Sequence, residues 1–325
     1  MELAFESQVS GNDTRFSYEP LMTAHPGENA IPVTDFAGKS LKLPWWVSSM
    51  TGGTEKAGTI NHNLAKACKE FGMGIGLGSC RSLIDDDTHL KDFTVRKSAG
   101  DEVPIFANLG IAQVEILVEQ NQTQKITDLV NKLEADGLIV HINPLQEWLQ
   151  PEGDAIKEAP LVTLHKLIDK FKGKIIVKEV GQGFGPQSIE KLLQLPIEAL
   201  DFGAHGGTNF AQLELLRDNQ LALECLEPLT RIGHTAVEMV SYVNTLLDYK
   251  DTLCRNVIIS GGIKNFLDGY YLLKSCHANA VYGQASGFLK HAMGNYESLQ
   301  QYCELQKKGL QAAYTYLTLR GHDTQ

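Results

Sequence analysis

The sequence predicts an α/β protein folded as a (β/α)8 TIM barrel with an N-terminal extension. From residue 43 onward, eight short apolar or β-branched runs alternate with longer helix-like stretches, a pattern typical of βα units and a parallel sheet. The span of these units is close to the roughly 250 residues of a typical closed barrel. The residues that suggest chemistry follow the expected strands, where barrel enzymes build active sites. Counting alone leaves an open doubly wound sheet as the alternative.

The expected strands are short and rich in Val, Ile and Leu. They cover residues 43–49, 73–78, 104–109, 137–143, 174–180, 199–202, 256–260 and 280–282. Between them, apolar residues recur with helical spacing. This spacing predicts helices at 59–71, 124–135, 161–171, 188–195, 235–247 and 267–275, and residues 203–255 leave room for another around 212–216.

The chain is expected to form one domain. It has 325 residues, of which 43% are hydrophobic, enough to bury one substantial core. No Gly/Ser linker, low-complexity tract or fixed-period repeat interrupts the sequence. We expect residues 1–42 to form an N-terminal extension, 43–295 the barrel and 296–325 a C-terminal helix.

The composition narrows the possible partners and compartments. A formal net charge of -10 argues against binding nucleic acid or an anionic membrane through bulk electrostatics, so any phosphate site must be local. The six cysteines are scattered without a Cys-x-x-Cys pair, which favours reduced thiols and a cytoplasmic location. The sequence has no signal-peptide pattern at its start and no run of about 18 apolar residues. We therefore expect neither export nor a membrane span.

Glycine-rich turns follow the last three expected strands. They contain Gly206, Gly207 and Thr208 after the sixth strand, Gly261 and Gly262 after the seventh, and Gly283 and Ala285 after the eighth. Glycine lets backbone N–H groups approach an anion closely, and a helix N-terminus favours negative charge. One such turn could simply be a tight connection, but several at one end of a barrel favour a cofactor that carries phosphate. The turns match neither a P-loop nor a dinucleotide fingerprint, which disfavours nucleotide hydrolysis.

Two polar residues end the fourth expected strand. His141 and Asn143 are two positions apart, so their side chains point to the same side of the strand. They could converge on a ligand, or His141 could be a core histidine and Asn143 a turn former. Glu147 and Glu152 follow and could bind Mg2+ through carboxylate oxygens, although acidic loop residues are commonly just solvated.

Two basic residues suit an anionic ligand. Lys178 lies within the apolar strand Ile-Ile-Val-Lys, and a buried ammonium needs a partner or an anionic ligand. Arg81 could form a two-pronged contact with phosphate or carboxylate, or it could be an ordinary surface arginine.

The motifs taken together resemble the type 2 isopentenyl-diphosphate isomerases over nearly the whole chain. In order, they are Ser-Met-Thr-Gly-Gly from Ser49, Ala-Asn-Leu-Gly around Asn108, His-Ile-Asn-Pro-Leu-Gln-Glu from His141, Gln-Pro-Glu-Gly-Asp to Asp154, Val-Lys-Glu-Val-Gly around Lys178, Gly-Gly-Thr to Thr208, and Ser-Gly-Gly-Ile from Ser260. The most specific of these motifs are the one that begins at His141 and the one that ends at Asp154.

The resemblance implies an FMN-dependent isomerase that interconverts isopentenyl and dimethylallyl diphosphate. FMN would be held by Ser49, Met50, Thr51, Ser79, Asn108, Lys178, Thr208, Gly261, Gly262, Gly283 and Ala285. Substrate would be held by Ser79, Arg81, His141, Asn143 and Gln146, with Glu147 on the Mg2+ that bridges to the diphosphate. The implied catalytic residues are Gln146, Lys178 and His141.

In the resembled family the reduced flavin is thought to act as the acid-base, with NADPH or another reductant preparing it. Lys178 would stabilise negative charge on the reduced flavin, and Gln146 would orient the reacting carbons. The resemblance also implies a homo-oligomer, either a tetramer or an octamer.

Three departures from the family pattern bear on activity. Cys80 replaces a glutamine between Ser79 and Arg81, and Gly203-Ala204-His205 replaces the start of the family's Ser-Gly-x-Gly-Gly-Thr. The family's Arg-Lys-x-x-His diphosphate motif is absent, and residues 2–5 match the segment that follows it. We expect that motif immediately upstream of Met1.

Two other functions remain open at this point. One is an FMN-dependent 2-hydroxy-acid oxidoreductase on the same barrel, which would need a histidine base and paired arginines for a carboxylate. The other is a flavin-binding homologue without catalytic activity, suggested by the missing diphosphate motif.

Overall fold

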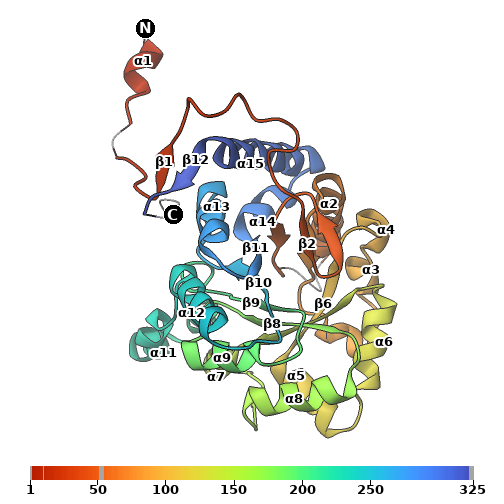
Figure 1. The fold of residues 1–325 in the computed structure, drawn as a ribbon. Helices are drawn as coiled ribbons and strands as arrows, with labels where there is room; N and C mark the ends of the chain where they lie inside the picture. Colours follow the sequence, from red (N-terminus) through yellow and green to blue (C-terminus); the bar gives the residue numbers. More distant parts are fainter. Residues whose placement is uncertain (1, 10, 51–54, 322–325) are drawn as a thin grey trace.

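The computed structural model describes residues 2–9, 11–50 and 55–321 and confirms the closed barrel of parallel strands with helices around it (Figure 1). The barrel strands are β4 (Trp45–Val47), β5 (Gly74–Gly76), β6 (Ile105–Gly110), β7 (Gly137–Ile142), β8 (Lys174–Glu179), β9 (Ala199–Asp201), β10 (Asn256–Ser260) and β11 (Asn279–Gln284). Each strand pairs with its sequence neighbours, and β11 pairs with β4 to close the ring. All eight expected strands are therefore present, with shifts of a few residues at their ends.

The alternating side chains of the strands build two layers inside the barrel. The lower layer is apolar and consists of Trp46, Phe106, Ile139, Ile176, Ala199, Ile258 and Val281. Residues two positions further along a strand face the same side. The layer above it therefore consists of Ser48, Asn108, His141, Lys178, Asp201, Ser260 and Gly283. The apolar layer supports a polar floor at the C-terminal end of the barrel.

Helices surround the barrel, most of them packed into the main apolar core and a few into a separate small cluster. They are α2 (Glu55–Phe71), α3 (Leu90–Phe93), α4 (Arg96–Ala99), α5 (Ile111–Glu119), α6 (Gln124–Lys132), α7 (Pro144–Leu149), α8 (Pro160–Lys170), α9 (Pro186–Leu193), α10 (Phe210–Arg217), α11 (Gln220–Leu226), α12 (Ala236–Tyr249), α13 (Phe266–Ser275), α14 (Ser286–Ala292) and α15 (Tyr296–Tyr316), with 3-10 turns at Arg81–Ile84 and Glu227–Arg231. The six helices expected from periodicity are all present. The segment 203–255 holds α10, α11 and α12, one helix more than expected.

A hairpin that the sequence analysis did not predict closes the N-terminal end of the barrel. Strands β2 (Thr34–Phe36) and β3 (Lys39–Leu41) pair in antiparallel fashion, and their apolar residues join the lower barrel layer. The Phe36 ring lies edge-on to Trp46, with 5.8 Å between the ring centres. Water is thus excluded from the base of the barrel.

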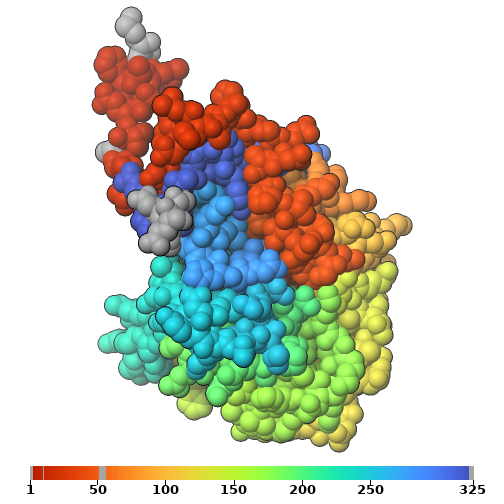
Figure 2. Space-filling view, viewed as in Figure 1, coloured from red at the N-terminus to blue at the C-terminus, as the bar shows by residue number. Residues whose placement is uncertain are grey.

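The two ends of the chain meet on one side of the molecule. Strand β1 (Phe16–Tyr18) pairs in antiparallel fashion with β12 (Leu317–Leu319), so helix α15 ends at Tyr316, earlier than the expected C-terminal helix. The short helix α1 (Glu2–Glu6) projects from the body (Figures 1 and 2). Within the described ranges, no helix is long and apolar enough to cross a membrane.

The packing of the hairpin gives a stability prediction. Replacing Phe36, which is 2% exposed, by Ala should lower the free energy of unfolding by about 3–5 kcal/mol because it leaves a cavity against Trp46. Chemical denaturation would measure the change. Val33→Ala, at a nearby residue that is 64% exposed, should stay within about 0.5 kcal/mol of wild type. Equal losses for the two variants would show that the hairpin does not depend on this contact.

Candidate active site

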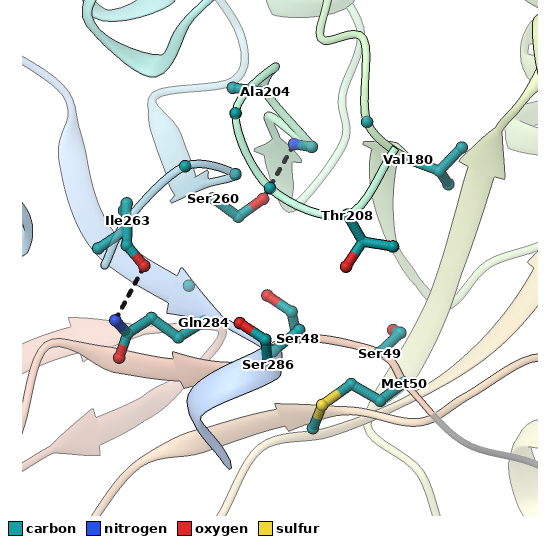
Figure 3. A pocket seen from close by; sticks show the side chains of 18 of the residues that line it. Ser48, Ser49, Met50, Val180, Ala204, Thr208, Ser260, Ile263, Gln284 and Ser286 are labelled. Atoms are coloured by element: carbon teal, nitrogen blue, oxygen red, sulfur yellow. Dashed lines mark hydrogen bonds between the residues drawn. The ribbon is translucent and has the colours of Figure 1, made fainter. Parts of the chain in front are cut away.

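A cavity opens at the C-terminal end of the barrel, above the polar floor (Figure 3). Its volume is about 520 Å3, within the range of roughly 300–1,000 Å3 typical of cofactor and ligand sites. Residues that line it include Ser48, Ser49, Met50, Lys178, Val180, Gly206, Gly207, Thr208, Phe210, Ser260, Gly261, Gly262, Lys264, Gly283, Gln284, Ala285 and Ser286. The cavity is thus lined by residues of strands β8 to β11 and β4, or of the turns that follow these strands.

Two glycine-rich turns pack against each other at one end of this cavity. A Cβ atom at Gly261, whose φ is +89°, would lie 2.0 Å from the carbonyl oxygen of Ala204. A Cβ atom at Gly207 would lie 3.3 Å from the backbone nitrogen of Gly262. A side chain at Gly261 is therefore excluded, and backbone groups form this wall. Such a wall suits an anion such as phosphate.

Two serine hydroxyls at the cavity lack a partner in the protein. The buried Oγ atoms of Ser48 and Ser49 make no hydrogen bond to any described residue. Both side chains line the cavity (Figure 3). Because buried polar groups are normally satisfied, these hydroxyls are suited to a polar ligand.

A second cavity, of about 160 Å3, adjoins the first. The two share Ser49, Met50, Lys178, Val180 and Phe210 in their linings. The smaller cavity adds Gly78, Ser79, Asn108, His141 and Gln146. The shared residues make the two cavities parts of one site, in which two ligands could meet beside Lys178.

His141 is held in one protonation state. Its Nδ1 lies 2.8 Å from Oδ1 of Asn108, and the Asn108 amide nitrogen donates to the carbonyl oxygen of Leu77. That second bond orients the amide, so Nδ1 of His141 carries the proton and Nε2 is left as an acceptor. Burial, and then the charge of Lys178, lower the pKa of His141 to about 3. The ring is therefore neutral at physiological pH.

Gln146 is oriented by residues on both sides. Its Nε2 donates to Oε1 of Glu214 at 2.9 Å, and its Oε1 accepts from Nδ2 of Asn143 at 3.3 Å. Glu214 is 2% exposed and also accepts a 2.6 Å hydrogen bond from Arg217. These bonds fix which way the Gln146 amide points.

The carboxylate of Glu147 lies beside this network. Its Oε1 accepts from Nδ2 of Asn143 and its Oε2 from the backbone N–H of Asp154, both at 2.8 Å. The Asp154 side chain in turn pairs with Arg81 at 2.5 Å and accepts from Gln113 at 2.7 Å. In the parts of the chain that the structure describes, no three His, Cys, Asp or Glu side chains gather as a ready-made metal site.

Lys178 stands at the centre of the site. It is 8% exposed, and its Nζ donates to the carbonyl oxygen of Glu179 at 2.6 Å. The Glu179 carboxylate accepts from the backbone N–H groups of Gly181, Gln182 and Gly183 at 2.6 to 2.8 Å. This turn fixes the carbonyl group that holds Lys178. Burial raises the pKa of Glu179, although the three N–H groups oppose the shift.

The structure brings most of the sequence-predicted residues to the two cavities. These are Ser49, Met50, Ser79, Asn108, His141, Gln146, Lys178, Thr208, Gly261, Gly262, Gly283 and Ala285. Asn143 is hydrogen-bonded to Gln146 of this lining. Glu147 is bonded to Asn143 and Arg81 to Asp154, so these two residues contact the lining only through other side chains. Thr51 lies outside the described residues. Cys80 is fully buried, and burial raises the pKa of its thiol to about 12.

Sequence reasoning missed several residues of the site. They are Ser48, Lys264, Gln284 and Ser286 in the larger cavity, Phe210 in both, and the buried acids Asp201 and Glu214. Asp201 lies within the apolar run Ala-Leu-Asp-Phe, the same signal that identified Lys178. Glu214 meets Gln146 across 68 positions of sequence, and no local pattern predicts such a contact.

Comparison with solved structures identifies the class of fold. The recombinant flavin-binding domain of baker's yeast flavocytochrome b2 aligns with a TM-score of 0.61 at 13% identity, over 92% of this chain and 71% of that chain. A mandelate oxidase mutant with a monooxide FMN adduct gives 0.57 at 10% identity, over 94% and 88%. The protein thus shares the TIM-barrel fold of these flavoenzymes. No protein-family model matches the chain.

Sequence relatives identify the family within that class. The isopentenyl-diphosphate delta-isomerase of Rickettsia felis is 36% identical over 258 residues, which cover 79% of this chain and 72% of that protein. The enzyme of the same name from Rickettsia typhi is 35% identical over 266 residues, 82% and 75% of the two chains. The chain belongs to the isopentenyl-diphosphate delta-isomerase family.

The environment of His141 predicts how it titrates. Its NMR signals should show no inflection between about pH 5 and 8, because its pKa is about 3 and a model histidine titrates near 6.5. Asn108→Asp would place a carboxylate against Nδ1 and should raise the pKa by about one unit or more.

The same pKa shift has a consequence for folding. The unfolded chain takes up this proton near pH 6.5 but the folded chain does not, so folding stability should fall as the pH drops below about 6.5. An inflection near pH 6.5 in the NMR signals of His141 in wild-type protein would contradict the assignment of a neutral His141 ring.

Proposed function

We propose that the protein is a type 2, FMN-dependent isomerase that interconverts isopentenyl diphosphate and dimethylallyl diphosphate. The observation that carries the proposal is the pair of joined cavities that meet at Lys178, one bounded by glycine turns and one by His141 and Gln146. Membership of the isopentenyl-diphosphate delta-isomerase family supports the substrate. From the sequence we also propose a cytoplasmic location and a single domain. From the resemblance we propose a homo-tetramer or homo-octamer with NADPH as the reductant.

The residues of the larger cavity fit FMN. Its phosphate would be held at the turns of Gly207, Thr208, Gly261 and Gly262, where a side chain at Gly261 would collide with Ala204. The hydroxyls of Ser48 and Ser49 have no partner among the described residues and would serve the flavin, alongside Met50, Thr51, Ser79, Asn108, Gly283 and Ala285. When bound and reduced, FMN supplies a group that can give a proton to the alkene and take one back.

The residues of the smaller cavity would position the substrate. His141 offers Nε2 as an acceptor because Nδ1 is committed to Asn108. Gln146 presents an amide whose direction is set by Glu214 and Asn143. Lys178 holds a positive charge between the two cavities, where it would favour an electron-rich flavin edge. The shared wall residues would keep water from the reacting carbons.

The diphosphate would be bound at the rim with Mg2+. Glu147 is the proposed metal ligand, since Mg2+ commonly uses one or two carboxylates and completes its shell with phosphate oxygens and water. The absence of a three-ligand cluster among the described side chains fits such a site. Arg81, now paired with Asp154, would turn to the diphosphate, which is the more highly charged partner.

A 2-hydroxy-acid oxidoreductase on the same barrel is the alternative. One solved structure that shares the fold is that of a mandelate oxidase, but at 10% identity it bears on the fold alone. The described linings of the two cavities contain Lys178, Lys264 and His141 but no arginine, whereas a carboxylate substrate would favour paired arginines. Reduction of bound flavin by a 2-hydroxy acid would support the alternative, and FMN binding without any turnover would support a non-catalytic homologue.

FMN binding can be tested with a charge in the phosphate turn. Gly207→Asp should weaken FMN binding at least about tenfold relative to Gly207→Ala, because a carboxylate beside phosphate costs well over 1.4 kcal/mol. Riboflavin, which lacks the phosphate, should bind both variants alike. Quenching of flavin fluorescence during titration of the apo-protein measures both affinities. If micromolar wild-type protein quenches no FMN fluorescence, the proposed cofactor is wrong.

The metal role of Glu147 can be separated from cofactor binding. Glu147→Gln should abolish Mg2+-dependent isomerisation of isopentenyl diphosphate by the reduced protein, while FMN affinity stays near wild type. Glu152→Gln is the matched control, since Glu152 is bonded to Arg217 at the surface and should retain activity. Thermal melting would confirm that both variants fold. Undiminished turnover in Glu147→Gln would place the metal elsewhere, with Glu152 the next candidate.

A further inference from the structure

A buried carboxylate lies next to Lys178 and has no role in the function proposed above. Asp201 is completely buried and pairs directly with Lys178 in the register of strands β8 and β9. Directly paired residues of neighbouring strands point to the same face of the sheet, and here that face is the inside of the barrel. Asp201 therefore lies in the polar floor beneath the two cavities.

The hydrogen bonds of Asp201 favour its ionised form. The backbone N–H of Gly203 donates to Oγ of Ser260 at 2.9 Å, and this hydroxyl donates to Oδ1 of Asp201 at 2.5 Å. A chain of donors that ends on a carboxylate stabilises the anion. Burial raises the pKa of Asp201, whereas Lys178 and the Ser260 bond act in the opposite direction.

The remaining oxygen of Asp201 needs a charge partner. Oδ2 has no hydrogen-bond partner among the described residues, and a buried, unpaired carboxylate oxygen is costly. Among the described residues, Lys178 makes one hydrogen bond, to Glu179, of the three that an ammonium can donate. Glu179 is less suited to this role, because its Oε2 already accepts from three backbone N–H groups and its side chain, one position after Lys178, points to the other face of the sheet.

We propose that Asp201 is a positioning residue that holds the Lys178 side chain in place in the polar floor of the site. Lys178 then presents a fixed positive charge to the ligand of the larger cavity, and Asp201 itself touches no ligand. Where that ligand is FMN, which rests on the proposed function, the Asp201–Lys178 pair favours binding of the reduced, electron-rich flavin over the oxidised form.

The first test needs no flavin. Unfolding of the apo-protein is compared for wild type, Asp201→Asn, Lys178→Met and the double variant. If the two charges interact, Asp201→Asn should raise the unfolding equilibrium constant at least about threefold more when Lys178 is present than when it is replaced. Glu198→Gln, at the opposite end of the barrel and 3.7 Å from Lys174, is the control and should be additive with Lys178→Met. Additive effects of Asp201→Asn and Lys178→Met would overturn the proposal.

A second measurement covers the case in which Asp201→Asn does not fold. The carboxyl carbon of Asp201, followed by 13C NMR in labelled protein, should report an anion at neutral pH in wild type and a shift toward the acid in Lys178→Met. A protonated Asp201 in wild-type protein would overturn the proposal.

The third test measures FMN binding. Its expected result depends on Lys178, which a purely structural role of Asp201 would not predict. Asp201→Asn should lower the preference for reduced over oxidised FMN at least about tenfold, measured as the ratio of the two dissociation constants. In the Lys178→Met background, Asp201→Asn should not lower this preference for reduced FMN, because the ammonium through which Asp201 acts has been removed. Equal losses in both backgrounds would overturn the proposal. If wild-type protein binds no FMN, the proposed function fails, while the unfolding comparison still decides the role of Asp201.

Discussion

The site depends on the two-residue period of the barrel strands. On seven of the eight barrel strands the residue of the apolar layer is followed, two positions later, by a residue of the floor, as Ile139 is by His141 and Ile176 by Lys178. A shift of one residue in any strand would send its polar group to the outer helices and its apolar neighbour into the site. The hairpin packed beneath Trp46 holds this arrangement at its base. The positions of the polar floor residues thus depend on the hydrophobic packing below them.

Strand register also determines how charge is distributed across the floor. His141, Lys178 and Asp201 pair in one row across β7, β8 and β9. Burial lowers the pKa of His141, and the ammonium of Lys178 in the same row lowers it further. The row therefore combines an ammonium, a neutral imidazole and a carboxylate.

Much of this arrangement is visible in the sequence because it is local. The strands, the glycine turns after them and Lys178 within an apolar run all follow from short-range patterns, and each lies where expected. The hairpin at residues 34–41 escaped prediction because its strands have three residues each, too few for a period to show. The contacts of Gln146 with Glu214 and of Glu147 with the backbone of Asp154 depend on how loops fold over the barrel. Residue types suggested that these groups matter, but only the structure shows what orients them.

The loop network also explains why the Gln146 amide has a single useful direction. Its nitrogen faces Glu214, a carboxylate that can only accept, and its oxygen faces the nitrogen of Asn143. Reversing the amide would set oxygen against carboxylate and nitrogen against nitrogen, so both bonds would be lost together. Arg217 holds Glu214 from outside, and the cluster of Leu149, Ala211 and Leu215 packs α7 against α10. A small apolar core outside the barrel thereby sets the direction of one amide inside the site, which no residue of the barrel strands could do alone.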